Sequence, residues 1–499
     1  MEETKLHMTI PEKVQQIIQV LQAHGYEAFA VGGCVRDTVL GRIPEDWDIT
    51  TSATPQQVKE LFFHTIDTGI AHGTVTVMLE REGFEVTTYR IDGEYEDSRH
   101  PKNVEFTTNL ELDLERRDFT INAMAYNDKT GIVDVFDGLG DIKRKRIRCV
   151  RQAHQRFEED ALRMLRAIRF AGQLGFTIEE NTEKAMRELA GNLRHISAER
   201  IRVELTKLLI SPGAGRIRDA YRMGITKIVL PQLDDMMEVE QDNPHHIYTV
   251  GEHSIRAVEY MNAFFGKEHV WEEEGTGRIE FARHALGEDV YMRIRQQCEG
   301  YTKKQHTILC FVMLLHDVAK PSCMTVDEDG CGHFYGHPAA GGKLAEEILH
   351  NLKFDNETID IAIRLIRWHD YRFAPKEHAK KNVVRRAASK IGSDIMELLF
   401  LVERADALAQ NPKTHAKKLA VIEEAEQLYQ EIVRDSECLS VKDLAVNGKD
   451  LIEAGIQTGP KLGGILKELL EYVLEHPEKN TRDELLEYVE QNKGRILCR

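Results

Sequence analysis

Two aspartates near the start of the chain are spaced for metal chemistry. Asp46 and Asp48 follow Gly32, Gly33 and Arg36. If the segment around the aspartates is a strand, side chains two apart point to one face, and the carboxylates lie side by side. Mg²⁺ binds carboxylate and phosphate oxygens, so the pair predicts a two-metal site for phosphoryl displacement, with the glycines and arginine against a triphosphate. An isolated pair of this kind is more often solvated or a helix cap.

A predicted hairpin adds a third carboxylate. Residues 73–79 and 84–90 alternate in polarity and are rich in β-branched residues, which predicts two strands joined by a turn near Gly83. Glu85 then lies on a neighbouring strand and is a candidate third ligand, although a single strand glutamate usually faces solvent. The arginines at 116–117 come next, and guanidinium forks suit phosphate and ribose oxygens.

A later segment carries a candidate base reader. Residues 158–171 contain good helix formers, and Asp160 and Arg163 are three apart, hence on one helical face. Together they can accept from an exocyclic amine and donate to a ring atom, which would select C and A against G and U. The alternative is a weak surface ion pair. Arg166 and Arg169 extend a basic stripe that is expected to follow RNA or triphosphate.

In chain order these motifs resemble the class II tRNA nucleotidyltransferases, which are the CCA-adding enzymes and their relatives the bacterial poly(A) polymerases. Residues 32–37 with the two aspartates match the first motif, and residues 116–122 match the ribose-binding second motif. Asp137-Gly138 falls where the third motif joins head to neck, and residues 159–163 match the nucleotide-selecting fourth motif. Residues 92–101 resemble the flexible loop of members that add the terminal A.

The resemblance implies a template-independent enzyme that adds C, C and A to the tRNA 3′ end from CTP and ATP. Mg²⁺ is expected at the aspartate pair. The resemblance also assigns phosphate contacts to Arg36 and Arg117, ribose contacts to Asp118 and Asn122, and base selection to the fourth motif. An A-adding enzyme or a poly(A) polymerase remains an alternative, because both share the same chemistry.

A second constellation lies in the helical half of the chain. Periodicity puts His316 and Asp406 on apolar helix faces, where a buried carboxylate needs a compensating partner such as a metal. The order of residues resembles the HD-domain phosphohydrolases, some of which accompany tRNA nucleotidyltransferases and hydrolyse phosphoesters, including 2′,3′-cyclic phosphates. Imidazole-rich ligation suits Mn, Fe, Co, Ni or Zn. The expected ligands are His253, His316, Asp317, His337, His369 and Asp406.

Two alternatives apply to this constellation. The segment can be an HD fold kept only for packing. Conversely, the whole protein can be an HD metal phosphohydrolase acting on RNA ends, with a head that only delivers RNA. The presence of all core ligands argues against packing alone, and the intact carboxylates and fourth motif argue against a head that only delivers RNA. A purely RNA-binding protein would have no use for two complete metal-ligand sets.

Basic residues mark two candidate RNA contacts. One is a run near the head boundary, for which a solvated turn face is the alternative. The other is a glycine-rich tail that resembles the tRNA-contacting segment of bacterial CCA-adding enzymes, although such glycines also cap ordinary helices. The candidate residues are Lys143, Arg144, Lys145, Arg146, Lys449, Lys461 and Lys467.

Composition predicts a large multi-domain enzyme. The 499 residues are 42% hydrophobic, and the net charge of -17 argues against indiscriminate polyanion binding. The eight cysteines are scattered and no segment is long and apolar enough to span a membrane, so a reducing, cytoplasmic location is expected without a membrane partner. The oligomeric state is not predicted.

The predicted fold class is α+β. A polymerase-beta-like nucleotidyltransferase head with a mixed sheet is followed by a mostly helical neck, an HD domain and a tail. The predicted domains are residues 1–150 for the catalytic head, 151–240 for the nucleotide-selecting and RNA-binding neck, 241–415 for the HD domain and 416–499 for the tRNA-binding tail.

Overall fold

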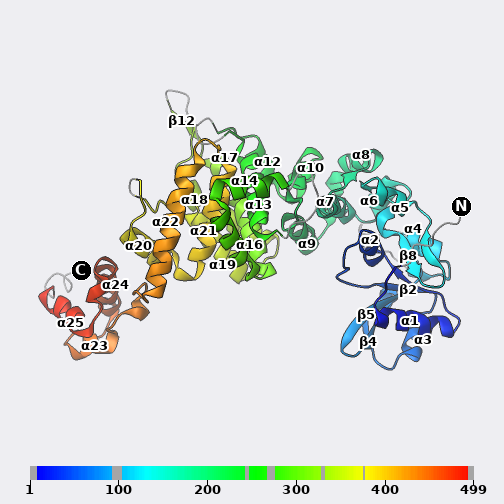
Figure 1. Ribbon diagram of the computed structural model, residues 1–499, viewed down its shortest axis with the longest axis horizontal. Coiled ribbons are helices and arrows are strands. Elements are labelled where there is room, and N and C mark those ends of the chain that lie inside the picture. The colour runs from blue at the N-terminus through cyan, green and yellow to red at the C-terminus, as the bar shows by residue number, and fades with distance from the viewer. Residues whose placement is uncertain are drawn as a thin grey trace. The chain divides into compact units, whose positions relative to one another are not determined.

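The structure is a computed structural model that describes residues 8–92, 104–241, 247–266, 276–327, 332–374 and 377–492. It divides into two compact units, Met1–Asp234 and Asp235–Arg499. The strands of the large sheet lie in the first unit, and the second is almost wholly helical (Figure 1). The predicted α+β class is confirmed. The finer predicted boundaries at 150 and 415 stay predictions.

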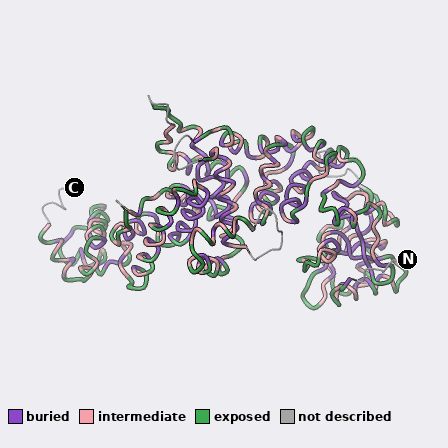
Figure 2. The backbone as a smooth tube through the Cα atoms, turned by 45° about the horizontal axis from the view of Figure 1, so that its top comes forward, coloured by how far each residue is buried: buried purple, intermediate pink, exposed green. Residues whose placement is uncertain are grey.

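A seven-stranded mixed sheet forms the base of the first unit. Its strand order is β3-β4-β5-β2-β1-β8-β9, with β2 and β5 parallel and the other neighbours antiparallel. Both faces of its central strands are buried, as the purple tube there shows (Figure 2). The strands are β1 (Ala28–Val31), β2 (Ile49–Thr51), β3 (Thr65–Gly69), β4 (Thr74–Leu79), β5 (Glu82–Thr88), β8 (Met124–Asn127) and β9 (Gly131–Asp134).

The predicted hairpin is present as β4 and β5, but its turn lies earlier than expected. Met78 pairs with Gly83 inside the ladder, so Gly83 is a strand residue. The turn is made by Glu80 and Arg81, both of which have positive φ, at 48° and 72°. Two consecutive residues with positive φ form the tight hairpin turn whose twist matches that of the strands. Glycine adopts positive φ most readily, but neither of the two turn residues is glycine.

Helices and short strand pairs complete the first unit. Two small sheets pair β6 (Arg90–Asp92) with β7 (Val104–Phe106) and β10 (Arg146–Ile147) with β11 (Thr177–Ile178). The helices are α1 (Glu12–Ala23), α2 (Gly33–Val39), α3 (Pro55–Leu61), α4 (Leu110–Glu115), α5 (Gly138–Lys143), α6 (Ala153–Glu159), α7 (Leu162–Leu174), α8 (Glu180–Leu189), α9 (Ala198–Leu209), α10 (Ile217–Arg222) and α11 (Thr226–Val229), with α12 (Pro231–Met237) spanning the division between units.

Helix α7 packs unusually closely against the turn after α9. A Cβ on Gly213 would lie 2.4 Å from the carbonyl oxygen of Gly172. We therefore expect Gly213→Ala to lower the free energy of unfolding by about 1–3 kcal/mol, because backbone must shift to admit the methyl group. Urea unfolding monitored by circular dichroism measures the change. Gly191→Ala is the matched control, since its Cβ would meet only the end of the Arg194 side chain at 3.7 Å; equal losses in both variants would contradict the packing argument.

Over its described residues, the second unit is a helical assembly with one short antiparallel strand pair, β12 (Thr325–Val326) and β13 (Gly332–His333). Helices α13, α16, α19 and α21 contact one another around a buried core. The helices are α13 (Val250–Phe265), α14 (Thr276–Leu286), α15 (Glu288–Glu299), α16 (Lys303–Leu315), α17 (Lys320–Cys323), α18 (His337–Asn351), α19 (Asn356–Trp368), α20 (Lys381–Ile391), α21 (Met396–Ala409), α22 (His415–Arg434), α23 (Gly448–Glu453), α24 (Pro460–Glu475) and α25 (Arg482–Gln491).

The C-terminal helices have a hydrophobic core of their own. Val446, Leu451, Leu469, Val473 and Leu485 are buried together there. None of the described helices combines the length and apolar character needed to cross a membrane.

Candidate functional site

The backbone around the two aspartates differs from the predicted strand. Strand β2 begins at Ile49, so Asp46 and Asp48 lie in the segment that leads into it. The expectation of a strand over residues 46–48 was wrong. Regular pairing with β1 stops at Ile49, and beyond it the Val31 amide donates one hydrogen bond to the Asp48 carbonyl at 3.0 Å. The pairing of β2 with β5 still brings the carboxylates of Asp48 and Glu85 together. Ile49 pairs with Val86 in parallel, so Glu85 lies alongside Asp48.

Two of the three carboxylates, Asp48 and Glu85, respond to burial and to neighbouring charge. Burial raises the pKa of Asp48, and the charge of Asp46 raises it further, while Arg117 opposes both effects. Burial likewise raises the pKa of Glu85, followed by the charges of Asp48 and Asp46. Carboxylates whose ionisation is opposed by burial and by each other are stabilised by a shared cation. The donor set therefore fits divalent metal ions.

Gly32 lets an arginine approach this site. Its φ of 84° is one that other residues rarely adopt, and it is the residue that precedes α2. A Cβ at this position would lie 2.8 Å from Nη1 of Arg117, and Gly33 opens the helix itself. Arg117 is also 3.6 Å from Asp113. The structure thus brings Gly32, Arg117 and Asp48 together, as the motif order led us to expect.

Arg36 lies in a buried network instead of facing an open site. Its guanidinium donates to Asp37, at 2.8 and 3.0 Å, and to Oδ1 of Asn122 at 2.6 Å. Asn122 in turn donates to Asp118 at 3.0 Å. The predicted phosphate and ribose contacts of these residues stay predictions. In the structure they hold the first and second motifs against each other.

The same network continues into the neck. Arg166 donates to Asp118 at 2.8 Å, and Arg169 donates to Glu204 at 2.5 Å. Burial would raise the pKa of Asp118, but the charge of Arg166 and the hydrogen bonds from Asn122 and Arg166 outweigh burial and hold it well below the usual range. The predicted basic stripe is therefore largely neutralised by buried carboxylates. Sequence reasoning missed Glu204, whose position in α9 carries no motif signal.

The fourth motif is not a continuous helix, contrary to the prediction. Asp160 lies in the break between α6 and α7, with extended backbone, and its Oδ1 accepts a hydrogen bond from the Leu162 amide at 3.1 Å. The carboxylate caps the new helix, a role that competes with continued helix. The prediction that Asp160 and Arg163 share one helical face was therefore wrong.

Each residue of this pair has its own partner. Arg200 of α9 donates a hydrogen bond to each carboxylate oxygen of Asp160, at 3.2 and 2.7 Å. Arg163 donates to Glu159 at 2.7 Å and to the Arg116 carbonyl at 2.9 Å. No sequence signal points to Arg200, because it lies far along the chain in an ordinary amphipathic helix.

The predicted RNA-contacting residues lie on surfaces. Lys143, Lys145 and Arg146 are exposed, whereas Arg144 forms ion pairs with Asp137 and Asp141. In the tail, the side chains of Lys449, Lys461 and Lys467 are exposed on α23 and α24. All of the predicted flexible loop, residues 92–101, lies outside the described residues except Asp92.

The second unit brings all six predicted HD ligands into one buried cluster. Every member except His337 is buried. Helix α13 carries His253 and helix α21 carries Asp406. The other four members lie at helix ends: His316 and Asp317 follow α16, His337 begins α18, and His369 follows α19. The members are His253, His316, Asp317, His337, His369 and Asp406, called here the hexad.

Asp317 divides the hexad into two groups of ligand atoms. Its Oδ2 is 3.2 Å from Nε2 of His316 and 3.7 Å from Nε2 of His253. Its Oδ1 is 3.3 Å from Nε2 of His337 and 3.5 Å from Nε2 of His369. Within each three-residue group that contains Asp317, the ligand atoms lie within 4.8 Å of one another. One carboxylate thus faces two adjacent candidate metal positions.

The imidazoles are oriented for metal binding. The other ring nitrogen, Nδ1, lies against a backbone carbonyl in each of His253, His316, His337 and His369, at 3.3, 2.8, 2.8 and 2.7 Å. With Nδ1 held by these carbonyls, each Nε2 faces Asp317, so a cation, either a proton or a metal ion, is needed between the nitrogen and the carboxylate. Oδ1 of Asp317 is buried without a hydrogen bond, as a metal-bound oxygen would be.

Two lysines complete this cluster and were not predicted. Lys320 lies 2.7 Å from Oδ2 of Asp317, and Lys418 lies 2.5 Å from Oδ2 of Asp406. Burial would lower the pKa of His316, but Asp317 and Asp406 raise it to about 10. The cluster therefore attracts positive charge, which supports its fit to a transition metal.

Comparison with known proteins matches both units. The family model for the poly A polymerase head domain matches residues 28–148, that for the RNA and SrmB-binding site of polymerase A matches residues 175–237, and that for tRNA nucleotidyltransferase domain 2 matches residues 339–489. Each of the three models covers less than half of the chain, so over these stretches the chain is similar to poly(A) polymerases in the first unit and to tRNA nucleotidyltransferases in the second.

Relatives named CCA-adding enzyme match up to about half of the chain. The protein of Leuconostoc mesenteroides is 52% identical over 202 residues, which are 40% of this chain and 50% of the relative. That of Oceanobacillus iheyensis is 46% identical over 243 residues, which are 49% of this chain and 59% of the relative. The chain thus spans about half the length of the first curated relatives that it matches.

Solved structures extend the likeness. The Bacillus stearothermophilus CCA-adding enzyme in complex with CTP has a TM-score of 0.64 and 28% identity, covering 98% of this chain and 99% of that chain. The Thermotoga maritima CCA-adding enzyme has a TM-score of 0.53 and 19% identity, covering 97% of each chain, which shows a shared fold alone.

Proposed function

We propose that this protein is a CCA-adding tRNA nucleotidyltransferase that uses CTP and ATP. The observation that carries the proposal is the convergence of Asp46, Asp48 and Glu85 beside Arg117. Arg163 of the neck donates to the carbonyl of the adjacent Arg116. The likeness of the chain to relatives named CCA-adding enzyme, and to one solved with CTP, supports this substrate class.

In the proposed mechanism, Asp46 and Asp48 would hold two Mg²⁺ ions, with Glu85 beside them. Bound there, the ions would supply activation of the RNA 3′-hydroxyl and charge stabilisation of the departing pyrophosphate. Arg117, held against Gly32, orients the triphosphate. Asp118 and Asn122 face the ribose, and Asp160 with Arg163 hydrogen-bond the amine and ring edge of C or A.

Transcripts of tRNA that end before CCA, after C, or after CC test this proposal. Purified protein with Mg²⁺ is given CTP and ATP separately and together, and products are resolved on sequencing gels. We expect C, C and A to be added in order, followed by termination. Addition of A to the CC end alone would instead mean an A-adding enzyme, and a growing A tail would mean a poly(A) polymerase.

Arg200 is expected to be a positioning residue for base selection. Because it grips both oxygens of Asp160, Arg200→Gln frees that carboxylate to rotate away from the base amine. We expect the ratio of kcat/KM for CTP over UTP to fall by about tenfold, and Arg200→Lys to restore part of it. Single-nucleotide incorporation measures the ratio. Arg194→Gln, an exposed arginine just before α9, is the control; an unchanged ratio in the Arg200 variant would remove this role.

We further propose that the hexad forms a two-metal phosphohydrolase centre acting on phosphoesters at RNA ends. The arrangement of four imidazole Nε2 atoms about Asp317 supports this second activity. Mn, Fe, Co, Ni or Zn fits such ligands better than Mg does. Bound metals would supply an activated water, and the protein contributes the fixed orientation of its ligands.

The tail lysines and the exposed basic run are proposed to contact the tRNA backbone. A cytoplasmic location, where tRNA and both nucleotides are present, belongs to the same proposal.

A further inference from the structure

Asp406 is a hexad member whose two carboxylate oxygens have different surroundings. Its Oδ1 lies 2.9 Å from Nε2 of His253 and 3.6 Å from Nε2 of His316. These are the two imidazoles that also face Oδ2 of Asp317, so Oδ1 of Asp406 belongs with that group of ligand atoms. A carboxylate binds a metal through one oxygen or through both, and the choice changes the coordination number.

The other oxygen of Asp406, Oδ2, is already held by the protein. The Lys418 ammonium lies 2.5 Å from Oδ2. The Gln410 amide donates to Oδ2 at 3.1 Å and to Oδ1 at 3.3 Å. Because two donors meet at Oδ2, they oppose rotation of the carboxylate and keep Oδ1 directed at the imidazoles.

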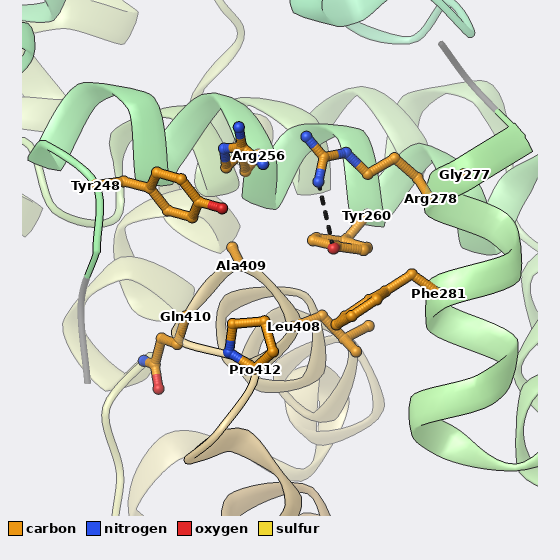
Figure 3. Close-up of a pocket in the computed structure, with 10 residues that line it drawn as sticks. All are labelled: Tyr248, Arg256, Tyr260, Gly277, Arg278, Phe281, Leu408, Ala409, Gln410 and Pro412. Atoms are coloured by element: carbon orange, nitrogen blue, oxygen red, sulfur yellow. Dashed lines mark hydrogen bonds between the residues drawn. The ribbon is translucent and has the colours of Figure 1, made fainter. Parts of the chain in front are cut away.

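Gln410 reaches Asp406 from the segment where α21 ends. Figure 3 shows residues 408–412 beside a small pocket, with the Gln410 amide turned away from the rings of Tyr260 and Phe281. The amide hydrogen-bonds Asp406 instead, four residues earlier in the chain. Chain connectivity alone therefore brings Gln410 near this carboxylate, whereas Lys418 comes from another helix.

The helix that carries Lys418 is α22, whose residues from 416 onward were predicted to belong to the tail. Its Glu423 and Glu426 accept hydrogen bonds from Arg404 of α21, at 2.9 and 2.8 Å. Arg404 is fully buried and lies two residues before Asp406. This buried ion-paired contact fixes α22 against α21, and with it the position of Lys418 beside the metal ligand.

We propose that Lys418 is a positioning residue of the metal centre, which holds Oδ2 of Asp406 and restricts this ligand to the oxygen that faces His253 and His316. The role rests on the proposed phosphohydrolase function. It makes a residue outside the predicted HD domain part of the support for one of the two metal positions. Partners that orient a metal ligand in this way typically change metal affinity by about 10–100-fold when they are removed.

The metal content of Lys418→Met tests this role. Full-length protein is loaded with Ni²⁺ and desalted, and bound metal is counted by mass spectrometry. We expect about two metals per chain in the unsubstituted protein and about one in the variant, because only the position beside His253 and His316 loses a fixed ligand. Lys418→Arg keeps the charge and should restore part of the lost affinity.

A double variant shows which metal position depends on Lys418. His369→Ala removes a ligand from the other group of imidazoles, the one that faces Oδ1 of Asp317. Each single variant should therefore keep about one metal per chain, and Lys418→Met combined with His369→Ala should keep none. One metal retained by the double variant would overturn the assignment of Lys418 to the position beside His253.

Cobalt absorption separates positioning from a general loss of structure. The visible bands of bound Co²⁺ weaken as its coordination number rises. Because Lys418→Met releases Oδ2 and lets both oxygens of Asp406 bind, we expect weaker bands in this variant at cobalt concentrations that fill the position. Lys418→Arg should keep the spectrum of the unsubstituted protein.

Lys381→Met is the matched control. The Lys381 side chain is 31% exposed, against 29% for Lys418, and it pairs with Glu437 at 2.9 Å instead of with a hexad member. This variant should keep both metals. If Lys418→Met does not fold, Lys418→Gln is measured in its place, since it removes the charge and keeps a polar end.

The outcomes separate this role from the metal centre itself. Two metals bound with unchanged affinity and an unchanged cobalt spectrum in the folded Lys418 variant would overturn the positioning role and leave the metal centre standing. Absence of bound metal in the unsubstituted protein would overturn both the centre and the role of Lys418.

Discussion

Replacing both Asp46 and Asp48 with alanine is expected to reduce incorporation of C and A by roughly 10³-fold or more. Burial opposes the ionisation of Asp48 and Glu85, and a bound cation would compensate for it. Once Asp46 and Asp48 are removed, the proposed cations have no comparable ligands. The rate is measured as single-turnover addition of radiolabelled CMP to a tRNA transcript. Retention of the normal rate would refute the assignment of this site.

The control must separate catalysis from folding. Asp67→Ala removes an exposed carboxylate that is paired with Lys59 on the edge strand of the same sheet, so it tests a general charge effect. Because removing two repelling charges relieves strain in the metal-free protein, the double variant should unfold at no lower temperature than the parent. A lowered midpoint with lost activity would point to structure instead.

The sheet of the first unit was predictable where alternation was strong. Residues 74–79 and 82–88 alternate clearly, and the hairpin formed as expected. The turn was misplaced because Gly83 is the usual marker of positive φ, whereas Glu80 and Arg81 adopt it here. Turn position depends on which register buries Val75, Val77 and Val86, and local residue preference does not decide that.

The neck was less predictable for a different reason. Helix propensity extends across residues 158–171, but Asp160 ends one helix and caps the next. The choice depends on Arg200, which approaches from α9 and fixes the carboxylate. Such a tertiary ion pair between residues far apart in sequence has no signature in either local segment, so a motif identifies the candidate residue but not its partner.

The members of the hexad were predicted from the sequence, but the arrangement of their ligand atoms was not. Periodicity placed His316 and Asp406 on buried faces, and both are buried. Which atom faces which metal position depends on the rotation of each side chain, and the carbonyls that hold the Nδ1 atoms come from helix ends. The role of Asp317 between two groups follows only from helix packing.

The position of Asp317 between the two groups of imidazoles leads to the most specific prediction for the second unit. Asp317→Ala is expected to abolish binding of both transition metals, because its two oxygens face different groups of imidazoles. His369→Ala removes a ligand from only one group and should leave about one metal per chain. Metal content after Mn²⁺ or Ni²⁺ loading and desalting is measured by mass spectrometry, with at least about a 100-fold loss of affinity expected for Asp317→Ala.

Asp360→Ala is the control for this series, since its exposed carboxylate lies on the helix that leads to His369. The Asp317 variant should keep normal addition of C and A, because the carboxylates proposed for that reaction are in the other unit. One metal retained by Asp317→Ala would mean that this carboxylate serves a single position. In that case the two groups of imidazoles would be independent sites, and a shared-aspartate centre would be excluded even if hydrolysis of phosphoesters were observed.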